Sequence, residues 1–469
     1  MNVLICASEG APFIKTGGLA DVIGALPKAL KKEGVEARVM MPYYQKIKKK
    51  GTAKYLGYAY VRIADHNEYL GVFTETYNDV VYYFIDSDKY FNRETIYGHG
   101  DDGERFAFFC FAVLEAIKVV NFYPDIIHNN DWQTGLIPYI LKANYNYYPE
   151  YRRIKTIYSI HNIQYQGIFP KDLLNILFMP YSNSLEFNNC LNFMKTAIME
   201  SDIINTVSPT YKNEVLTDYY GYEMNKVLEL RKDDFYGIIN GLDVDKYNPK
   251  TDKNLFANYD SSSFVKGKKE NKQKLLSEYN VKSLDAPLFG LVSRLVEQKG
   301  IDLFMPILED VLYYSDAIFF MLGSGDKRYE DYFNYLASKY PSRFLTYIGY
   351  SDPLAQKIYA ASDIFLMPSK FEPCGLGQMI AMRYGALPLV RETGGLKDTV
   401  IPYNKYTGEG TGFSFTNYNA HNFKDVMFLA MKTYEDKKTW NMLVKRAMEQ
   451  DFSWNASAKS YIELYKKLM

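Results

Sequence analysis

Two basic residues in the second half of the chain stand where they could stabilise a leaving diphosphate. Arg294 and Lys299 follow an apolar run that is typical of a buried strand. A diphosphate gains negative charge as it departs, and each cation in contact with it could contribute up to ~4 kcal/mol at an effective dielectric near 20, before desolvation. Because two basic residues could also belong to a solvated loop, their position after a strand is the informative feature.

Two Thr-Gly-Gly-Leu sequences, at residues 16–19 and 393–396, occupy equivalent places in the two halves. Each follows a strand-like run and opens a segment with helical apolar spacing. Free amides and the helix dipole favour phosphate at such a helix start, and Lys15 adds a full charge beside the first one. A glycine pair in a turn can also serve the backbone alone. The residues expected at these two helix starts are Gly17, Gly18, Thr393, Gly394 and Gly395.

A single carboxylate, Glu372, follows another predicted strand in the stretch Met367–Gln378. A glycine then opens a helix that continues through Met379 and Met382. One acid can grip sugar hydroxyls, and the helix start offers amides to the same ligand. The first turn of the chain matches neither G-x-G-x-x-G nor G-x-x-x-x-G-K-[ST], so dinucleotide-binding and P-loop hypotheses lose support.

Composition excludes several classes of protein. Lys+Arg and Asp+Glu both number 55, so no net charge draws the chain to nucleic acid or to an anionic membrane. The cysteines at 6, 110, 190 and 374 form no C-x-x-C pair, which favours reduced thiols over a disulfide framework or zinc site. The sequence shows neither a signal-peptide pattern nor an apolar run long enough to span a membrane. We expect a cytoplasmic protein without a nucleic-acid or membrane partner.

Short apolar runs alternate with amphipathic segments, a pattern typical of βαβ units around parallel sheets. The predicted strands of the first half are Asn2–Ala7, Ala37–Met41, Val80–Ile85, Asp125–His128 and Thr156–Ile160. Those of the second half are Pro287–Ser293, Ala317–Leu322, Phe344–Tyr347, Ile364–Met367 and Leu387–Val390. The chain therefore predicts two doubly wound α/β domains. The polar segment from Lys246 to Leu284 indicates the entry to the second, with a boundary near 240–250.

The stretch Lys15–Leu19 resembles the N-terminal signature of bacterial glycogen synthases and plant starch synthases. Ser293–Gly300 matches the family's Ser-Arg-Leu-x-x-Gln-Lys-Gly, and Pro368–Leu376 matches Pro-Ser-x-Phe-Glu-Pro-Cys-Gly-Leu almost completely. His161–Gly167 is close to His-Asn-x-x-Tyr-Gln-Gly. The resemblance extends from Lys15 to near the C-terminus, in the family's order.

One block departs from the family. Residues 129–135 resemble its His-Asp-Trp-His-x-Gly loop, but Asn130 and Gln133 stand where histidines are usual. Asp131, Trp132 and Gly135 match, so the resemblance carries over the position of the loop and an acceptor-side role for Asp131, but no histidine chemistry. A helix N-cap explains Asp131 equally well.

The resemblance implies two Rossmann-like domains facing across a cleft, the GT-B type, with a C-terminal helix crossing back to the first domain. The corresponding ranges are 1–243 for the acceptor-side domain, 244–450 for the nucleotide-sugar domain and 451–469 for the returning helix, and Trp454–Leu468 has suitable helical spacing. The implied reaction is retaining transfer of glucose from ADP-glucose to the 4-hydroxyl of a non-reducing end of an α-1,4-glucan such as glycogen. It needs no cofactor and no metal.

Residue roles follow from the same resemblance. The catalytic residues are His161, Glu372, Arg294 and Lys299. Those that bind ADP-glucose are Lys15, Gly17, Gly18, Asn240, Arg294, Lys299, Tyr350, Cys374, Gly375, Leu376, Thr393, Gly394 and Gly395. In the family, the backbone carbonyl of the residue matching His161 faces the anomeric carbon, and Tyr350 matches an aromatic stacked on adenine. The acceptor-side residues are Glu9, Asp21 and Asp131.

Three other hypotheses stay open from the sequence. Asp86-Ser87-Asp88 and Asp243-Val244-Asp245 satisfy the Asp-x-Asp pattern of metal-dependent glycosyltransferases, although both look like turns. A related enzyme could use UDP-glucose or another acceptor. A non-catalytic glucan- or nucleotide-binding regulator could share the fold, but it would not need to keep the charged residues named above.

Overall fold

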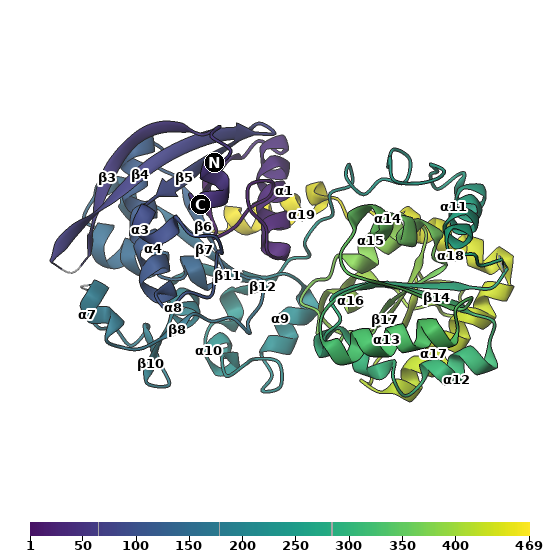
Figure 1. The fold of residues 1–469 in the computed structure, drawn as a ribbon. Helices are drawn as coiled ribbons and strands as arrows, with labels where there is room; N and C mark the ends of the chain where they lie inside the picture. The colour runs from purple at the N-terminus through teal and green to yellow at the C-terminus, as the bar shows by residue number, and fades with distance from the viewer. Residues whose placement is uncertain (64, 178, 283–284) are drawn as a thin grey trace. The chain divides into compact units, whose positions relative to one another are not determined.

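The chain divides into two compact units in the computed structural model, which describes residues 1–63, 65–177, 179–282 and 285–469 (Figure 1). Unit 1 contains Met1–Gly241 together with Trp454–Met469, and unit 2 contains Leu242–Ser453. The expected domain limits at 243/244 and 450/451 lie within a few residues of these divisions. Leu242 and Ser453 form a parallel β-bridge, so the two ends of unit 2 lie side by side.

Unit 1 is built on a nine-stranded sheet. Its strands are β1 (Asn2–Cys6), β2 (Glu36–Pro42), β3 (Lys54–Ile63), β4 (His66–Tyr77), β5 (Val80–Asp86), β6 (Ile126–Asn130), β7 (Lys155–Ile160), β11 (Ile203–Thr206) and β12 (Phe235–Gly237). Their order is β12-β11-β7-β6-β1-β2-β5-β4-β3, parallel except at β3 and β4. The five predicted strands of this half are confirmed, but β6 continues through Asn129 and Asn130, where a loop was expected. Three short strands form a second sheet, β8 (Ile168–Phe169), β9 (Glu186–Phe187) and β10 (Cys190–Asn192).

The sequence prediction missed β3 and β4, the antiparallel pair at the edge of the main sheet. One face of β3 carries Gly57 and Val61, and α4 (Asp102–Val120) packs against this strand. The other face carries exposed tyrosines, among them Tyr58 and Tyr60. Because strand residues alternate between the two faces, a half-exposed strand lacks the continuous apolar run that reveals a buried parallel strand.

The helices of unit 1 are α1 (Gly18–Lys32), α2 (Gln45–Lys48), α3 (Asp88–Phe91), α4, α5 (Ile137–Ile140), α6 (Pro149–Arg152), α7 (Leu173–Leu177), α8 (Phe193–Glu200), α9 (Pro209–Val215), α10 (Asn225–Glu229) and α19 (Trp454–Lys466). The predicted apolar stripe of α1 is buried, including Leu19, Val22 and Leu26. Helix α19, drawn yellow in Figure 1, packs against α1, so the C-terminal segment does return to unit 1.

Unit 2 contains a six-stranded, all-parallel sheet. Its strands are β13 (Leu288–Val292), β14 (Ile318–Gly323), β15 (Phe344–Ile348), β16 (Ile364–Met367), β17 (Leu387–Arg391) and β18 (Phe413–Phe415). The first five confirm the predicted strands of this half, whereas β18 is only three residues long and was missed. The order is β15-β14-β13-β16-β17-β18.

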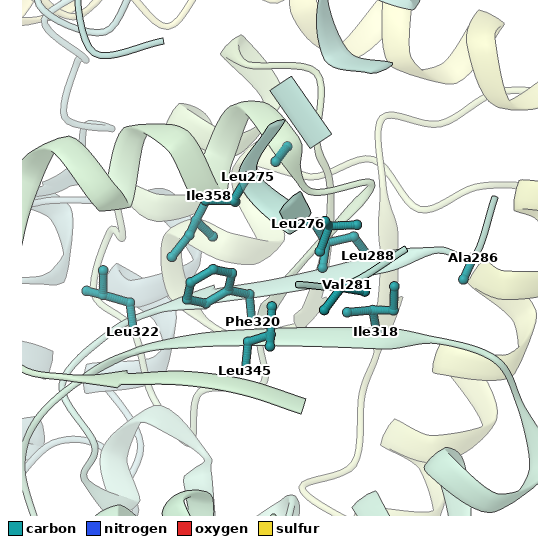
Figure 2. Packing of buried hydrophobic residues seen from close by; sticks show 11 residues of the cluster. Leu275, Leu276, Val281, Ala286, Leu288, Ile318, Phe320, Leu322, Leu345 and Ile358 are labelled. Carbon is teal, nitrogen blue, oxygen red and sulfur yellow. The ribbon is translucent and has the colours of Figure 1, made fainter. Parts of the chain in front are cut away.

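The helices of unit 2 cover this sheet. They are α11 (Phe264–Glu278), α12 (Leu308–Tyr314), α13 (Lys327–Lys339), α14 (Asp352–Ala361), α15 (Gly377–Arg383), α16 (Gly394–Thr399), α17 (Ala420–Glu435) and α18 (Lys437–Met448). Figure 2 shows Leu275 and Leu276 of α11 with Leu288, Ile318 and Phe320 of the strands in one buried cluster. Within the described residues, none of the chain's helices is long and apolar enough to span a membrane.

Helix α11 falls in the segment 246–284 that the sequence indicated as the entry to the second domain; residues 283 and 284 lie outside the described residues. Two of its lysines are buried. Lys268 donates hydrogen bonds to the carbonyl oxygens of Ala360, Ser362 and Tyr384 at 2.8–3.1 Å. Lys272 forms a 2.6 Å ion pair with Asp363. These contacts fasten the polar helix to the sheet of unit 2.

Lys268 makes the stability of unit 2 depend on pH. Burial lowers the pKa of its amine to about 7, so between about pH 7 and pH 10 the unfolded chain binds more protons than the folded one. Stability should therefore rise with pH over this window, by at most roughly 4 kcal/mol. We expect Lys268→Met to remove the rise. Urea unfolding followed by circular dichroism at pH 7.5 and 9.5 measures it, with the exposed Lys269→Met as control; equal pH slopes in all three proteins would contradict the prediction.

Candidate active site

Several of the predicted site residues follow the strands at the switch point of each sheet. In unit 1 the chain leaves β1 in one direction and β6 in the other, and these two strands are neighbours. In unit 2 the same holds for β13 and β16. Parallel α/β sheets bind ligands beyond the carboxyl ends of such strands. The turns after β1 and β6 carry Lys15 and Asp131, and the turns after β13 and β16 carry Lys299 and Glu372.

The turn after β1 has the predicted helix start, with Gly17 as N-cap and Gly18 as the first residue of α1. Lys15 Nζ lies 2.7 Å from both carboxylate oxygens of Asp21. The buried Glu9 carboxylate accepts hydrogen bonds from the amide and hydroxyl of Thr16, at 2.5 and 2.8 Å. Glu9 thus uses the amide of Thr16, the residue before the predicted glycine pair, and Lys15 carries the positive charge of this turn.

Asp131 follows β6 in a strained backbone conformation, with φ of 56°. Its side chain makes no helix-capping hydrogen bond; Asp131 Oδ1 accepts instead from the amide of His161, at 2.8 Å. Asp131 does occupy the N-cap position of the 3₁₀ helix Trp132–Thr134, as the alternative explanation proposed, but its carboxylate does not cap that helix. Burial raises the pKa of this carboxyl to about 7, and the negative charge of nearby Glu9 acts in the same direction.

His161 follows β7, at the next strand along the sheet. Its Nε2 lies 2.9 Å from Asn130 Oδ1, and burial lowers the pKa of its ring to about 4, so the imidazole is neutral near pH 7. The sequence did not indicate Tyr97, whose hydroxyl lies 2.8 Å from Ser8 Oγ and whose pKa burial and the charge of Glu9 raise. Tyr97 comes from a loop without a recognisable motif.

Asn240 lies just after β12, near the end of the first part of unit 1. Its side chain is buried, and Oδ1 has no hydrogen-bond partner among the described residues. A buried amide oxygen without a partner costs roughly 1–3 kcal/mol. The position fits the predicted role in ligand binding, although a polar atom of this kind could also bind solvent.

In unit 2 the two candidate cations differ in their surroundings. Lys299 Nζ forms a 2.6 Å ion pair with Glu372 Oε2, and both side chains are largely buried. Ser369 Oγ donates to the same carboxylate oxygen at 3.1 Å, a contact that the sequence did not indicate. Arg294 is exposed, and its guanidinium donates to Gln298 Oε1 at 3.3 Å. The second oxygen of Glu372 accepts no described hydrogen bond, so this carboxylate can still take one from a ligand hydroxyl.

The glycine pair of the second half has a structural role that the sequence did not reveal. Thr393 is the N-cap of α16, as expected. The amide of Gly395 donates to the carbonyl oxygens of Glu372 and Pro373, at 3.2 and 3.1 Å, instead of facing outward for phosphate. A Cβ atom on Gly394 would overlap the carbonyl oxygen of Glu372. The pair therefore lets the Glu372 loop approach the start of α16.

The remaining predicted residues of unit 2 lie around this loop and after β15. Cys374 is buried, Gly375 has φ of 74° and Leu376 is the N-cap of α15. Tyr350 is 76% exposed, and its hydroxyl donates to the carboxylate of Asp352. An exposed ring at the end of a strand can stack on a base.

The two Asp-x-Asp sequences have structural explanations. Lys48 pairs with Asp86 and with Asp88, the latter at 2.6 Å. Asp243 Oδ1 accepts from the amides of Asp245 and Lys246, at 3.1 and 3.0 Å, as in a turn. In the part of the chain that the structure describes, no group of three or more His, Cys, Asp or Glu residues is arranged to hold a metal ion.

Comparison with known proteins gives matches over both units. The family model for the starch synthase catalytic domain matches residues 2–230, and the model for glycosyl transferases group 1 matches residues 272–449. Glycogen synthase of Acholeplasma laidlawii is 49% identical over 474 residues, covering 100% of this chain and 99% of the relative. Glycogen synthase of Bacillus subtilis is 47% identical, with coverage of 100% and 98%.

Solved structures of related proteins match this chain as well. The catalytic domain of starch synthase IV from Arabidopsis thaliana, bound to ADP and acarbose, superposes with a TM-score of 0.89 at 32% identity, covering 100% of this chain and 99% of that one. Sucrose-phosphate synthase from Thermosynechococcus elongatus, at 15% identity and a TM-score of 0.60, shares the fold. Its two parallel-sheet units and its full-length relatives show that the chain belongs to the glycogen synthase and starch synthase family of GT-B glycosyltransferases.

Proposed function

We propose that this protein transfers glucose from ADP-glucose to the 4-hydroxyl of a non-reducing end of an α-1,4-glucan, with retention of configuration and release of ADP. The observation that carries the proposal is the buried Lys299–Glu372 ion pair at the switch point of unit 2. Because the two side chains are held together in this ion pair, Lys299 can bind a diphosphate while Glu372 binds the hydroxyls of the attached sugar. The relatives that are named glycogen synthases and the ADP-bound starch synthase support the choice of donor and acceptor.

The cations serve the leaving group. As the bond between C1 of glucose and the phosphate oxygen breaks, its electron pair goes to that oxygen, and Lys299, Arg294 and Lys15 stabilise the charge. Lys15 is 47% exposed in its pair with Asp21. Because an exposed ion pair contributes at most about 1 kcal/mol, exchanging Asp21 for phosphate costs little. Tyr350, by stacking on adenine, fixes the nucleoside end.

The sugar is held by Glu372 and His161, which accept hydrogen bonds from its hydroxyls. Cys374, Gly375 and Leu376 line the space beside it. The transition state has oxocarbenium character, and the acceptor 4-oxygen attacks C1 on the face that the phosphate leaves. The 4-hydroxyl proton passes to the departing phosphate oxygen, so no protein nucleophile is consumed.

The carboxylates that follow β1 and β6 bind the glucan acceptor. Glu9 and Asp131 are close enough that the charge of Glu9 raises the pKa of Asp131. A carboxyl with a pKa of about 7 can accept or donate a hydrogen bond to a glucan hydroxyl near neutral pH. Asn240, in contrast, offers its unpaired amide oxygen to ADP-glucose. The proposed setting is the cytoplasm.

Donor and acceptor are tested by measuring ADP or UDP release from the purified protein. We expect release from ADP-glucose that requires glycogen or a malto-oligosaccharide, with kcat/KM for UDP-glucose at least about tenfold lower, because the nucleotide contacts would favour adenine. New linkages should be α, as judged by NMR of the product. Faster transfer from UDP-glucose would move the assignment to a related synthase; silence with both donors would favour a binding protein, and β-linkages would exclude retention.

A further inference from the structure

The side-chain amide of Asn130 has a single possible orientation. Asn130 Nδ2 donates to the carbonyl oxygens of Cys6 and His128, at 3.1 and 3.2 Å. Since a carbonyl oxygen only accepts, the nitrogen must face these two atoms, and Oδ1 must face His161 Nε2, 2.9 Å away. Asn130 is 1% exposed, so solvent does not compete for these contacts.

This orientation fixes the tautomer of His161. The amide oxygen of Asn130 can only accept, so His161 Nε2 must carry the proton that is donated to it. The ring is neutral near pH 7, which leaves Nδ1 unprotonated with a lone pair. Nδ1 makes no hydrogen bond to the described residues, and the side chain is only partly buried, so this acceptor is available to a ligand.

The strand that carries Asn130 is held by a chain of buried hydrogen bonds in which each donor and each acceptor can be assigned. Ser159 Oγ donates to Asn205 Oδ1 at 2.6 Å, so it accepts from His128 Nε2, also at 2.6 Å. His128 Nδ1 then accepts from the hydroxyl of Tyr465 in α19, at 2.8 Å. The carbonyl group of His128 that accepts from Asn130 therefore belongs to a residue fixed on both sides of its ring.

We propose that Asn130 is a positioning residue for glucosyl transfer, which holds His161 as the Nε2–H tautomer so that Nδ1 accepts a hydrogen bond from a hydroxyl of the transferred glucose. The catalytic part of this inference rests on the proposed function. The tautomer does not, because it follows from the contacts of Asn130 alone.

The tautomer is measured directly by two-bond ¹H–¹⁵N NMR of the histidine-labelled full chain. The chain has only five histidines, so the His161 signals can be assigned by the loss of one set in His161→Gln. We expect an unprotonated Nδ1 and a protonated Nε2 in the wild type at pH 7.5. Asn130→Ala lacks the amide oxygen that accepts from Nε2. In this variant both neutral tautomers of His161 should be populated and should interconvert. A wild-type ring protonated at Nδ1 or at both nitrogens would overturn the inference without any variant.

Asn129→Ala is the matched control for kinetics. Asn129 is the neighbouring residue on β6 and points to its opposite face; it is fully buried, and neither polar atom of its side chain has a described hydrogen-bond partner. We expect Asn130→Ala to lower kcat about tenfold with the KM for glucan unchanged within about twofold, and Asn129→Ala to change kcat less than about twofold.

The outcomes separate the two proposals. A wild type that shows the Nε2–H tautomer but transfers no glucose would contradict the proposed function and leave the ring assignment standing. An active wild type whose kcat is unaffected by Asn130→Ala would show that Asn130 does not act on catalysis. Equal losses in Asn130→Ala and Asn129→Ala would point to general damage to β6 and also overturn the positioning role.

Discussion

Replacing Glu372 with alanine should reduce glucosyl transfer by at least about 100-fold while the protein stays folded. The change removes the proposed acceptor of the sugar hydroxyls and leaves the ammonium group of Lys299, 18% exposed, without its 2.6 Å partner. Without its partner, the Lys299 ammonium group can rotate away from the diphosphate. The variant therefore loses both the hydrogen bonds to the glucose and part of the stabilisation of the leaving diphosphate. Initial rates of ADP release with saturating glycogen, together with circular dichroism of each variant, give the measurement.

Two control variants test whether the effect comes from the Glu372 carboxylate itself or from the loss of any ion pair in this region. Glu372→Gln keeps the size and one acceptor oxygen but not the charge, so it should retain more activity than Glu372→Ala. Glu297→Ala breaks the nearby, exposed Lys370–Glu297 pair, which spans 2.7 Å, and should change the rate less than about twofold because exposed pairs contribute little. If Glu372→Ala keeps more than about a tenth of the wild-type rate, the carboxylate does not have the proposed role.

Gly394→Ala should both destabilise unit 2 and abolish transfer. Gly394 has φ of 44°, and a Cβ atom there would overlap the carbonyl oxygen of Glu372. Because that atom is backbone, the Glu372 loop must shift as a whole, which also disturbs the hydrogen bonds from the Gly395 amide to Glu372 and Pro373. We expect a loss of stability of about 2–4 kcal/mol, the sum of backbone strain and displaced packing, and a rate below about 1% of wild type.

Gly408→Ala is the control for backbone strain alone. Gly408 also has positive φ, 71°, but the nearest atom to an added Cβ is the flexible Cε of Met442 at 3.6 Å. We expect this variant to lose only about 1 kcal/mol and to keep its activity. Urea midpoints and initial rates of the two variants decide the matter; equal losses would mean that φ, and not the contact with the Glu372 loop, explains the effect of Gly394→Ala.

The sequence predicted buried elements better than half-buried ones. Ten strands were predicted and all are present, because a strand covered on both faces must be a continuous apolar run. Strands β3 and β4 were missed because one face is exposed. Strands β11, β12 and β18 were missed because they are only three or four residues long, although β11 is fully buried. The returning helix α19 was indicated by its apolar spacing and by the family resemblance together.

Motif spacing located the candidate residues, but their partners lie far away in the chain. Lys299 and Glu372 are separated by 73 positions and meet because β13 and β16 are neighbours at the switch point. The bond between Asp131 and the His161 amide spans 30 positions, and no local rule distinguishes it from an N-cap. Tyr97 was missed for the same reason, because its contact with Ser8 spans 89 positions. Ser369 lies inside the block Pro368–Leu376, three positions from Glu372, but the motif does not show that its hydroxyl donates to that carboxylate.

The sequence by itself determined the fold class, the family and the order of the charged and glycine-rich turns, because these depend on local periodicity and on residue types at strand ends. Only the tertiary structure decided what each group can do. It showed that Gly395 uses its amide to hold the Glu372 loop, that Glu9 occupies the amide of Thr16, and that Asn130 determines which nitrogen of His161 carries the proton. Hydrogen-bond direction and burial arise between distant segments, so no single segment of the sequence contains them.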